Sequence, residues 1–413
     1  MYKKRELEKA LINNISKKDI AVILGSRQTG KTTLLKKIYD STDGRKSFVD
    51  LDIFENKSIF SSYSEAMKYL KFEGYEKNKK FILFLDEFHK VKKIGKILKN
   101  IYDNNPEIKI YATGSSSIEI IGQLKESMAG RKRIFNLYPL SFEEYLLFKD
   151  EVLYQKYRNS KKSDIPAIIG NKLDDLIKEY CIFGGYPEVA LEDKKEGKKE
   201  TIRKIFDLFV QKDLINFLNI KNPDAAYNIL KYIAINSGQI INYSDISNSC
   251  NVDINTQKRY INILNQLYII KTIPPFYTNK KKEIVKAPKI YFYDPGVRNF
   301  FIKNFASFED RNDNSFLLEN YFFSQIIKKI SWDTEIKYWR DKNEREVDFI
   351  IQKGNKINAY EIKNRKMIKK RDLSNLLFFK KSYTESKIYL LNFYFDTRLL
   401  NLNDLGLLRY YEI

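Results

Sequence analysis

The sequence predicts a mixed α/β protein that begins with a helix-covered parallel sheet and continues into further domains. Three observations support this fold class. Apolar segments typical of strands alternate with helical patterns up to about residue 140, which is the rhythm of βαβ units. The pattern then becomes mainly helical, and later mixed. A chain of 413 residues also exceeds the size of one ordinary core, so we expect two to four domains.

The first predicted strand, 20–24, leads through a glycine-containing loop into a helical pattern. Gly25, Gly30, Lys31 and Thr32 reproduce the phosphate-loop motif G-x-x-x-x-G-K-[ST] in the strand–loop–helix context that it requires. Inward-facing N–H groups and the helix N-terminus favour phosphates. Lys31 should reach the β- and γ-phosphates, and the Thr32 hydroxyl should join a Mg²⁺ shell. The alternative is an ordinary turn before a helix. The predicted site for ATP and Mg²⁺ comprises Gly25, Ser26, Arg27, Gln28, Thr29, Gly30, Lys31, Thr32 and Thr33.

A second apolar run, 81–85, ends in Asp86 and Glu87, as a buried parallel strand does when its carboxyl end opens onto a site. We expect both acids to face the phosphate loop from the neighbouring strand. Asp86 should hold Mg²⁺, usually through water, and Glu87 should orient and deprotonate the attacking water, so the predicted chemistry is hydrolysis. The alternative is an exposed acidic pair at a strand end.

A third predicted strand, 108–117, ends in a cluster of hydroxyl side chains. Thr113 or Ser115 could contact the γ-phosphate and sense its loss. The competing interpretation is an N-cap for the next helix, a position that Ser and Thr favour.

These segments together resemble a known family. The chain contains GSRQTGKTTL, FLDEFHKV, ATGSSS and MAGRKRIFNLYPLSFEEYL, followed by FGGYPEV (183–189) and YWRDKNEREVDFII (338–351). They resemble the AAA+-related prokaryotic ATPases with a C-terminal domain of unknown function (DUF4143), over nearly the whole chain. The resemblance implies that Arg131, with Arg133 as a second candidate, serves as an arginine finger toward a neighbouring subunit of a homo-oligomer. The alternative is a surface arginine in a basic loop.

Composition bounds the function further. The formal net charge is +21, which suits a phosphate-rich partner such as nucleic acid, although lysine could simply be the default solvent-facing residue. His89 is the only histidine and stands where relatives often carry Gln, so a metal site built on several histidines is excluded. No apolar stretch is long enough for a membrane span. The N-terminus reads as a helix rather than a signal peptide. Cys181 and Cys250 are isolated, so we expect a reducing cytoplasm.

Pattern changes divide the chain into four predicted parts. A helix capped by Ser141, with Glu144 three residues on, opens a mainly helical region that should form a lid beside the nucleotide. The predicted parts are a P-loop ATPase core (1–140), a helical lid (141–222), a winged helix (223–304) and a nuclease-like domain (305–413).

The predicted winged helix contains a helix whose apolar face carries Ile261, Leu264 and Leu267. Polar side chains at its start would face away, as a DNA-reading helix presents them, and basic residues would occupy the tip of a wing between strands around 269–293. The alternative is a winged helix used for domain packing or for docking a protein. The candidate DNA contacts are Asn255, Thr256, Lys258, Arg259, Lys280, Lys281 and Lys282.

The C-terminal region carries acids in the pattern of PD-(D/E)-x-K nucleases. Glu319 lies on a helical pattern, Asp348 early in one strand, and Glu361 with Lys363 on the next. Residues two apart on a strand share a face, two carboxylates can hold Mg²⁺, and a lysine can steady or deprotonate a water at a phosphodiester. The family resemblance implies the same restriction-endonuclease-like α/β fold. Ion pairing on a solvated sheet face is the alternative, and such domains can keep the fold for binding alone.

Two functions from different classes follow. One is an ATPase that couples hydrolysis to DNA binding or processing through the winged helix and the nuclease-like domain. The other is a nucleotide-switched ATPase in signalling or defence, whose C-terminal half docks a protein and does not cut nucleic acid.

Overall fold

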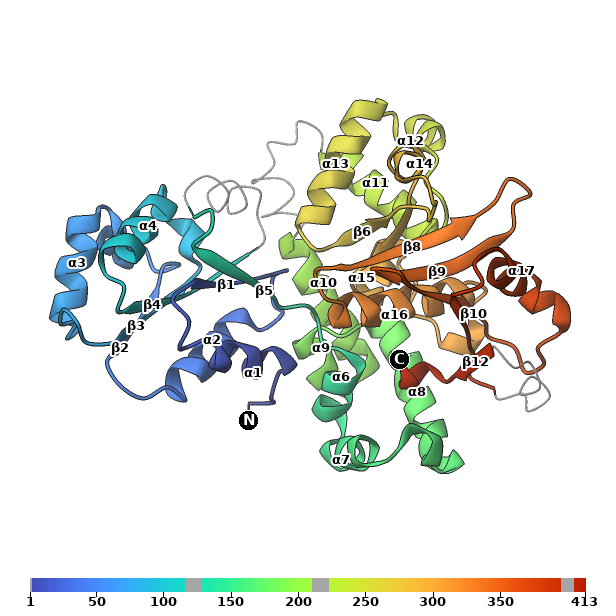
Figure 1. Ribbon diagram of the computed structural model, residues 1–413, viewed down its shortest axis with the longest axis horizontal. Coiled ribbons are helices and arrows are strands. Elements are labelled where there is room, and N and C mark those ends of the chain that lie inside the picture. Colours follow the sequence, from blue (N-terminus) through green and yellow to red (C-terminus); the bar gives the residue numbers. More distant parts are fainter. Residues whose placement is uncertain (1, 116–127, 210–222, 395–404) are drawn as a thin grey trace. The chain divides into compact units, whose positions relative to one another are not determined.

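The chain divides into two compact units (Figure 1). Unit 1 comprises Met1–Tyr138 with Gln266–Tyr268, and unit 2 comprises Pro139–Asn265 with Ile269–Ile413. The structure is a computed structural model, and it describes residues 2–115, 128–209, 223–394 and 405–413.

Unit 1 is built on a five-stranded parallel sheet in the order β2-β3-β4-β1-β5. The central strands β1 and β3 are buried along their whole length, as expected for strands covered on both faces. The elements of unit 1 are α1 (Glu6–Asn13), β1 (Ile20–Gly25), α2 (Lys31–Asp40), β2 (Lys46–Asp50), α3 (Tyr63–Phe72), β3 (Phe81–Asp86), α4 (Ile94–Asn104), β4 (Ile108–Ser115) and β5 (Lys132–Asn136).

Alternation along β1 separates two hydrophobic cores. Val22 and Leu24 pack in one core with apolar residues of α3 and α4, while Ala21 and Ile23 pack in the other with residues of α1 and α2. The two helix pairs therefore cover opposite faces of the sheet (Figure 1). This two-sided cover leaves the strand ends as the place for polar side chains.

The lateral order corrects one expectation. Asp86 and Glu87 do not follow the strand next to β1, because β4 lies between β1 and β3. The register pairs Ile23 with Thr113 on one side of β4 and Leu85 with Ala112 on the other. The predicted sensor strand, rather than the strand with the acids, is thus the direct neighbour of the phosphate-loop strand. Apolar strand sequences specify burial, and they carry little information about lateral order.

Unit 2 contains helices around a second five-stranded sheet in the order β12-β11-β10-β9-β8, and a separate antiparallel pair, β6 and β7. In the larger sheet β8, β9 and β10 are antiparallel, and β10, β11 and β12 are parallel. The helices of unit 2 are α6 (Phe142–Lys149), α7 (Glu151–Asn159), α8 (Ala167–Phe183), α9 (Pro187–Leu191), α10 (Lys195–Leu208), α11 (Pro223–Ile235), α12 (Tyr243–Cys250), α13 (Ile254–Gln266, whose last residue is grouped with unit 1), α14 (Lys280–Val285), α15 (Pro295–Ile302), α16 (Asn314–Lys329) and α17 (Ser374–Ser382). The strands of unit 2 are β6 (Ile270–Ile273), β7 (Lys289–Phe292), β8 (Thr334–Arg340), β9 (Glu346–Lys353), β10 (Lys356–Ile362), β11 (Lys387–Leu391) and β12 (Leu405–Leu408).

The helices predicted as a lid share a core with the C-terminal helix α16. The ring centroids of Tyr180 on α8 and Tyr321 on α16 lie 5.5 Å apart at 80°, and the N–H of Phe142 donates to Oε1 of Gln325 over 2.7 Å. The predicted capping box at the start of α6 is present, from Ser141 to Glu144. These helices are grouped with unit 2; their place beside a nucleotide, and the boundaries at 222 and 304, stay predictions.

The glycine pair of FGGYPEV has a structural explanation. Gly184 has φ +77°, and a Cβ there would lie 1.9 Å from Oδ1 of Asp294. The other carboxylate oxygen of Asp294 accepts from the N–H of Gly185 over 2.6 Å, while Oδ1 caps α15. Burial raises the pKa of Asp294 to about 6. This motif therefore joins α8 to α15 inside unit 2. Among the described helices, none is both long and apolar enough to cross a membrane.

Candidate functional site

The loop between β1 and α2 requires its two motif glycines. A Cβ on Gly25 would lie 2.1 Å from the carbonyl oxygen of Leu137, which is backbone and cannot move aside cheaply. Gly30 has φ +92° and precedes the first residue of α2, a conformation that favours glycine. Thr32 is partly buried and Thr33 exposed in the first turn of this helix. The loop thus delivers the chain to a helix N-terminus, where backbone N–H groups are available to an anion.

The Lys31 side chain is almost fully buried against its own loop. Its Nζ donates to the carbonyl oxygens of Gly25 over 3.1 Å and Ser26 over 2.8 Å, and the residue is 5% exposed. These acceptors are neutral, so a phosphate would offer the ammonium a stronger, charge-assisted partner.

Arg5 is a loop-supporting residue that the sequence analysis missed. Its guanidinium donates to the carbonyl oxygens of Thr29 over 2.7 Å and Tyr138 over 2.8 Å. The residue is 5% exposed and precedes α1 by one position. A buried arginine so far from the motif in sequence carries no local signal, and it stands next to the partly buried Lys3 and the exposed Lys4.

Thr113 on β4 links the two acids at the end of β3. Its hydroxyl donates to Oδ1 of Asp86 and accepts from the backbone N–H of Glu87 over 3.2 Å. Asp86 is 2% exposed, so Thr113 holds a buried carboxylate in place. Its predicted role as a γ-phosphate sensor stays a prediction. Ser115 ends β4, and its side chain, like residues 116 and 117, lies outside the described part of the chain.

Electrostatics distinguish Glu87 from its neighbours. Burial raises the pKa of the Glu87 carboxyl; Lys31 and Arg27 oppose the shift, and the Asp86 charge adds to it. The Nδ1 of His89 lies 3.4 Å from Oε2 of Glu87. Burial, together with Lys90, Arg27 and Lys31, lowers the pKa of His89 to about 4, so its ring is neutral at pH 7. The raised pKa moves Glu87 toward the range useful for accepting a proton.

The two candidate arginine fingers lie near the start of β1, whereas the loop follows the end of that strand. The carbonyl oxygen of Arg131 accepts from the N–H of Ile20, the first residue of β1, whereas the loop follows the last one. The Arg131 guanidinium contacts both carboxylate oxygens of Asp103, over 2.7 and 3.1 Å. Arg133 Nε lies 3.1 Å from Asp19. Neither arginine is therefore at the loop of its own chain, and the predicted contact with a neighbouring subunit stays a prediction.

The predicted reading helix has the expected form. The carboxylate of Asp253 accepts from the N–H groups of Asn255 and Thr256 and from the Thr256 hydroxyl, which fixes the start of α13. Asn255, Lys258 and Arg259 are exposed and Thr256 is partly buried. The apolar face, Ile261, Leu264 and Leu267, is buried.

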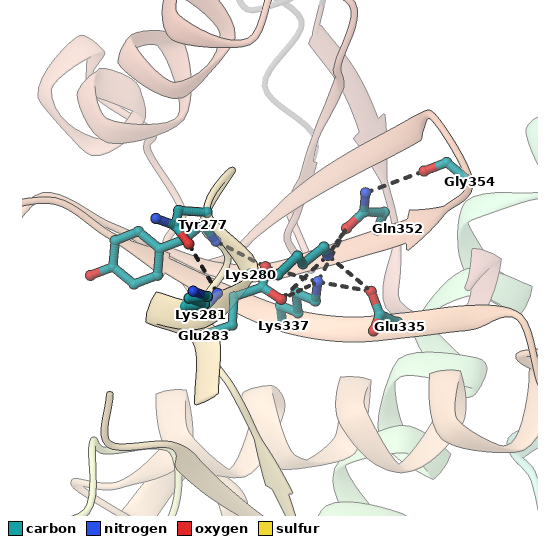
Figure 2. A network of polar contacts seen from close by, with 9 residues as sticks. Tyr277, Lys280, Lys281, Glu283, Glu335, Lys337, Gln352 and Gly354 are labelled. Atoms are coloured by element: carbon teal, nitrogen blue, oxygen red, sulfur yellow. Dashed lines mark hydrogen bonds and ion pairs between the residues drawn. The ribbon is translucent and has the colours of Figure 1, made fainter. Parts of the chain in front are cut away.

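The predicted wing tip is wrong, because Lys280, Lys281 and Lys282 begin the helix α14. The Lys280 ammonium lies 3.3 Å from Glu283 and 3.5 Å from Glu335. Figure 2 shows it within a polar network with β8 and β9, so it is not a free phosphate ligand. Lys281 is exposed, and the Lys282 side chain lies outside the described residues. The sequence concealed this arrangement, since the partners of Lys280 on the strands lie more than fifty residues away.

The C-terminal acids gather as the hairpin predicted. Tyr360 on β10 pairs with Phe349 on β9, which places Glu361 across from Asp348. Oδ2 of Asp348 accepts from the N–H of Ile362 over 2.8 Å, and Lys363 Nζ donates to Oε1 of Glu361 over 2.5 Å. The other oxygen of Glu361 is buried without a hydrogen-bond partner in the described structure.

Two of these carboxyl groups, those of Glu319 and Glu361, have raised pKa values. Burial and the Asp348 charge raise the pKa of Glu361 to about 8, with Lys363 opposing them. Burial and Asp348 likewise raise the pKa of Glu319, on α16, to about 8. Among the described residues, no three His, Cys, Asp or Glu side chains are arranged to hold a metal ion.

Two further residues of this cluster escaped the sequence analysis. The Tyr291 hydroxyl donates to Oε2 of Glu319 over 3.0 Å. Lys289 Nζ lies 2.5 Å from Glu346, and although burial lowers the pKa of Lys289, Glu319, Glu346 and Asp348 together raise it. A lysine at the first position of the apolar strand KIYF was the available signal, because such a buried cation needs acids nearby.

Unit 1 has an N-terminal parallel sheet like that of P-loop ATPases. Residues 17–146 match the AAA domain family, 174–307 match a domain of unknown function (DUF8612), and 314–405 match a domain of unknown function (DUF4143). The chain therefore joins an AAA domain to a C-terminal DUF4143 domain.

Relatives and solved structures place the chain in wider context. An uncharacterized protein of Methanocaldococcus jannaschii is 27% identical over 357 residues, covering 85% of this chain and 75% of that protein. An uncharacterized protein of Haemophilus influenzae is 25% identical over 391 residues, covering 91% of this chain and 90% of that protein. A Walker-type ATPase of Pyrococcus abyssi is similar at TM-score 0.47 and 17% identity, covering 73% of this chain and 96% of that one.

Proposed function

We propose that unit 1 hydrolyses ATP with Mg²⁺ and that hydrolysis is coupled to DNA binding or processing by unit 2. The observation that carries the ATPase part is the buried Lys31 in a loop that tolerates no Cβ at Gly25. In this proposal the loop N–H groups and Lys31 bind the triphosphate, and the Thr32 hydroxyl and the Asp86 carboxylate hold Mg²⁺, which neutralises developing charge. Oxygen donors of this kind are the ligands that Mg²⁺ prefers.

Glu87 is the proposed general base. Its carboxyl lies close enough to Lys31 and Asp86 for both to affect its pKa, so it belongs to the same electrostatic environment as the proposed phosphate and metal ligands. A raised pKa strengthens a carboxylate as a proton acceptor. His89 stays neutral beside it and does not compete for the proton.

The DNA part rests on charge and on α13. The chain carries a formal net charge of +21, and Lys258 and Arg259 are exposed on α13. The test is the rate of ATP hydrolysis with and without single-stranded, duplex and branched DNA at several salt concentrations. We expect stimulation that weakens steeply as salt rises. A rate indifferent to every DNA contradicts the coupling.

Cleavage is proposed at the cluster of Glu319, Asp348, Glu361 and Lys363. The buried, unpartnered oxygen of Glu361 and the raised pKa values of Glu319 and Glu361 support it, because a bound cation would stabilise the ionised carboxylates. We expect Mg²⁺-dependent nicking of DNA that is lost in Asp348→Ala and Lys363→Ala. Nicking that survives both substitutions would remove this assignment.

Homo-oligomerisation through Arg131 is part of the proposal. The location of Arg131 away from its own loop supports action on another subunit. Mixing Arg131→Ala protein, whose loop is intact, with Lys31→Ala protein, whose arginine is intact, should restore hydrolysis that neither has alone. No recovery in mixed samples that assemble would rule out a shared site.

The alternative is a nucleotide-switched ATPase that docks a protein through unit 2. The position of Lys280 inside a polar network favours it, since one expected phosphate contact is lost. This alternative predicts hydrolysis indifferent to DNA.

A further inference from the structure

A cleft of about 630 Å³ lies in unit 2, away from the acidic cluster. It is bordered by the α14 segment, the turn between β8 and β9, and the end of α17. Its volume is in the range of pockets that hold small organic ligands. Its lining combines three aromatic rings, four cations and one carboxylate.

The wall formed by α14 is fixed to β8. The ammonium of Lys337 lies 2.9 Å from both oxygens of Glu283, and Figure 2 shows this pair at the centre of the network that also contains Gln352. The Lys337 and Glu283 side chains are 1% and 8% exposed. A buried, multiply bonded pair of this kind holds α14 at a defined place on the strand, so the cleft is preformed.

The aromatic side of the cleft is supported from beneath. Trp339 is 6% exposed, and its ring packs edge-on against Phe379 at 5.4 Å. The ring centroid of Tyr383 lies 4.5 Å from that of Phe379 and 5.2 Å from that of Phe276. Tyr277 completes the lining, with its ring directed away from the ion-pair network (Figure 2). These rings are held by one another and lose little freedom when a flat ligand stacks on them.

Three of the four cations around the cleft are available for an anion, whereas Arg340 pairs with Glu344 and Glu346. Lys281, Lys286 and Lys342 are exposed, and in the described structure their ammonium groups have no hydrogen-bond or ion-pair partner. The single carboxylate, Asp341, already pairs with Arg345 over 2.9 Å. It also accepts from backbone N–H groups. The rim is therefore positively charged next to an aromatic surface.

We propose that this cleft binds single-stranded DNA, with an unstacked base against the partly exposed rings of Tyr277 and Tyr383, next to Trp339, and flanking phosphates on the lysines. The proposal rests on the DNA engagement proposed above and names its strand form and its contact surface. Stacking platforms beside a cationic rim are the means by which proteins hold single strands without reading sequence. A duplex keeps its bases stacked, so it cannot present one to these rings.

The protein offers a direct spectroscopic test. The chain has two tryptophans; Trp332 is 99% exposed, so Trp332→Phe leaves Trp339 as the sole reporter with little structural cost. We expect a thymidine oligonucleotide to quench Trp339 fluorescence at low salt, and a duplex of equal length to quench it at least tenfold more weakly. Equal quenching by duplex, or equal affinity for free thymidine monophosphate or ATP, overturns the proposal.

Charge reversal tests the rim in the full chain. Lys281→Glu with Lys342→Glu should weaken oligonucleotide affinity at least tenfold and flatten its salt dependence. The matched control is Lys356→Glu with Lys387→Glu, which changes charge equally at exposed residues outside the lining and should stay within about threefold of wild type. Similar losses in both pairs overturn the proposal. If DNA fails to stimulate hydrolysis while Trp339 is still quenched, the coupling fails and the cleft stands.

Discussion

The two units each place acids beside a lysine, but the lysine is held differently. In unit 1 Lys31 donates to two neutral carbonyl oxygens of its own loop, whereas in unit 2 Lys363 donates to Glu361, one of the acids. The two carbonyl oxygens that Lys31 bonds carry no net charge, so phosphates could replace them as acceptors. Lys363 is bonded to a carboxylate, so its departure would take a cation away from Glu361.

The acids differ in the same way. In unit 1 the Thr113 hydroxyl donates a hydrogen bond to the Asp86 carboxylate. In unit 2 burial and the Asp348 charge raise the pKa of both Glu319 and Glu361 to about 8. The acids of unit 1 are therefore held by a hydroxyl group, whereas those of the C-terminal cluster repel one another. A proton or a cation would relieve that repulsion.

The largest effect should come from Lys31→Ala. The loop ammonium is the cation expected on the β- and γ-phosphates, and removing one such stabilising donor slows turnover by roughly 100-fold or more. ATP hydrolysis and nucleotide binding measure it. Lys36→Ala is the matched control, since Lys36 is exposed on the same helix and should leave the rate unchanged. Normal turnover in Lys31→Ala would show that the loop ammonium does not act on the phosphates.

Glu87→Gln should separate binding from chemistry. We expect hydrolysis to fall roughly 100-fold, the loss of a positioned general base, while ATP affinity is retained. His89→Gln is the control, because His89 contacts Glu87 and is uncharged at pH 7. Its rate between pH 6 and 8 should match wild type. An unchanged rate in Glu87→Gln would mean that another group takes the proton.

Sequence reasoning succeeded where the chemistry is local. Gly25, Gly30 and Lys31 act within one loop, and their conformational demands appear directly as residue types. Strand pairing of Asp348 with Glu361 also followed, since a short hairpin fixes its own register. Both cases involve residues close in sequence, whose geometry is set by a few backbone angles.

What failed depended on contacts between distant segments. The order of β4 and β1 in the sheet was not predictable, because buried strands have similar apolar sequences. The three lysines of α14 looked like a loop tip, yet Lys280 is engaged by residues of β8 and β9. Lys289 and Tyr291 contact Glu346 and Glu319, residues of other segments that only tertiary packing brings close to them.

Lys337→Met tests how firmly unit 2 fixes α14. Removing one partner of a buried pair leaves Glu283 poorly compensated and should lower the free energy of unfolding by about 3 kcal/mol. Urea unfolding followed by tryptophan fluorescence reports on unit 2, which contains both tryptophans. Lys337→Met with Glu283→Leu should recover most of the loss. A single variant as stable as wild type would show that the pair contributes nothing.

Glu361→Gln should have the smallest effect, and one that depends on pH. The folded-state pKa of about 8 lies above the ordinary 4.5, so the folded state binds the proton more tightly than the unfolded state. The resulting stabilisation is complete below about pH 4.5 and is lost as pH rises toward 8. The neutral glutamine avoids that loss, so the variant should match wild type near pH 4.5 and become the more stable of the two as pH rises toward 8. Unfolding free energies across this range measure the difference, with exposed Glu385→Gln as the control expected to follow wild type. Parallel pH profiles for Glu361→Gln and wild type would mean that Glu361 is ionised throughout, and the contrast between the two units would then reduce to the partners of their lysines.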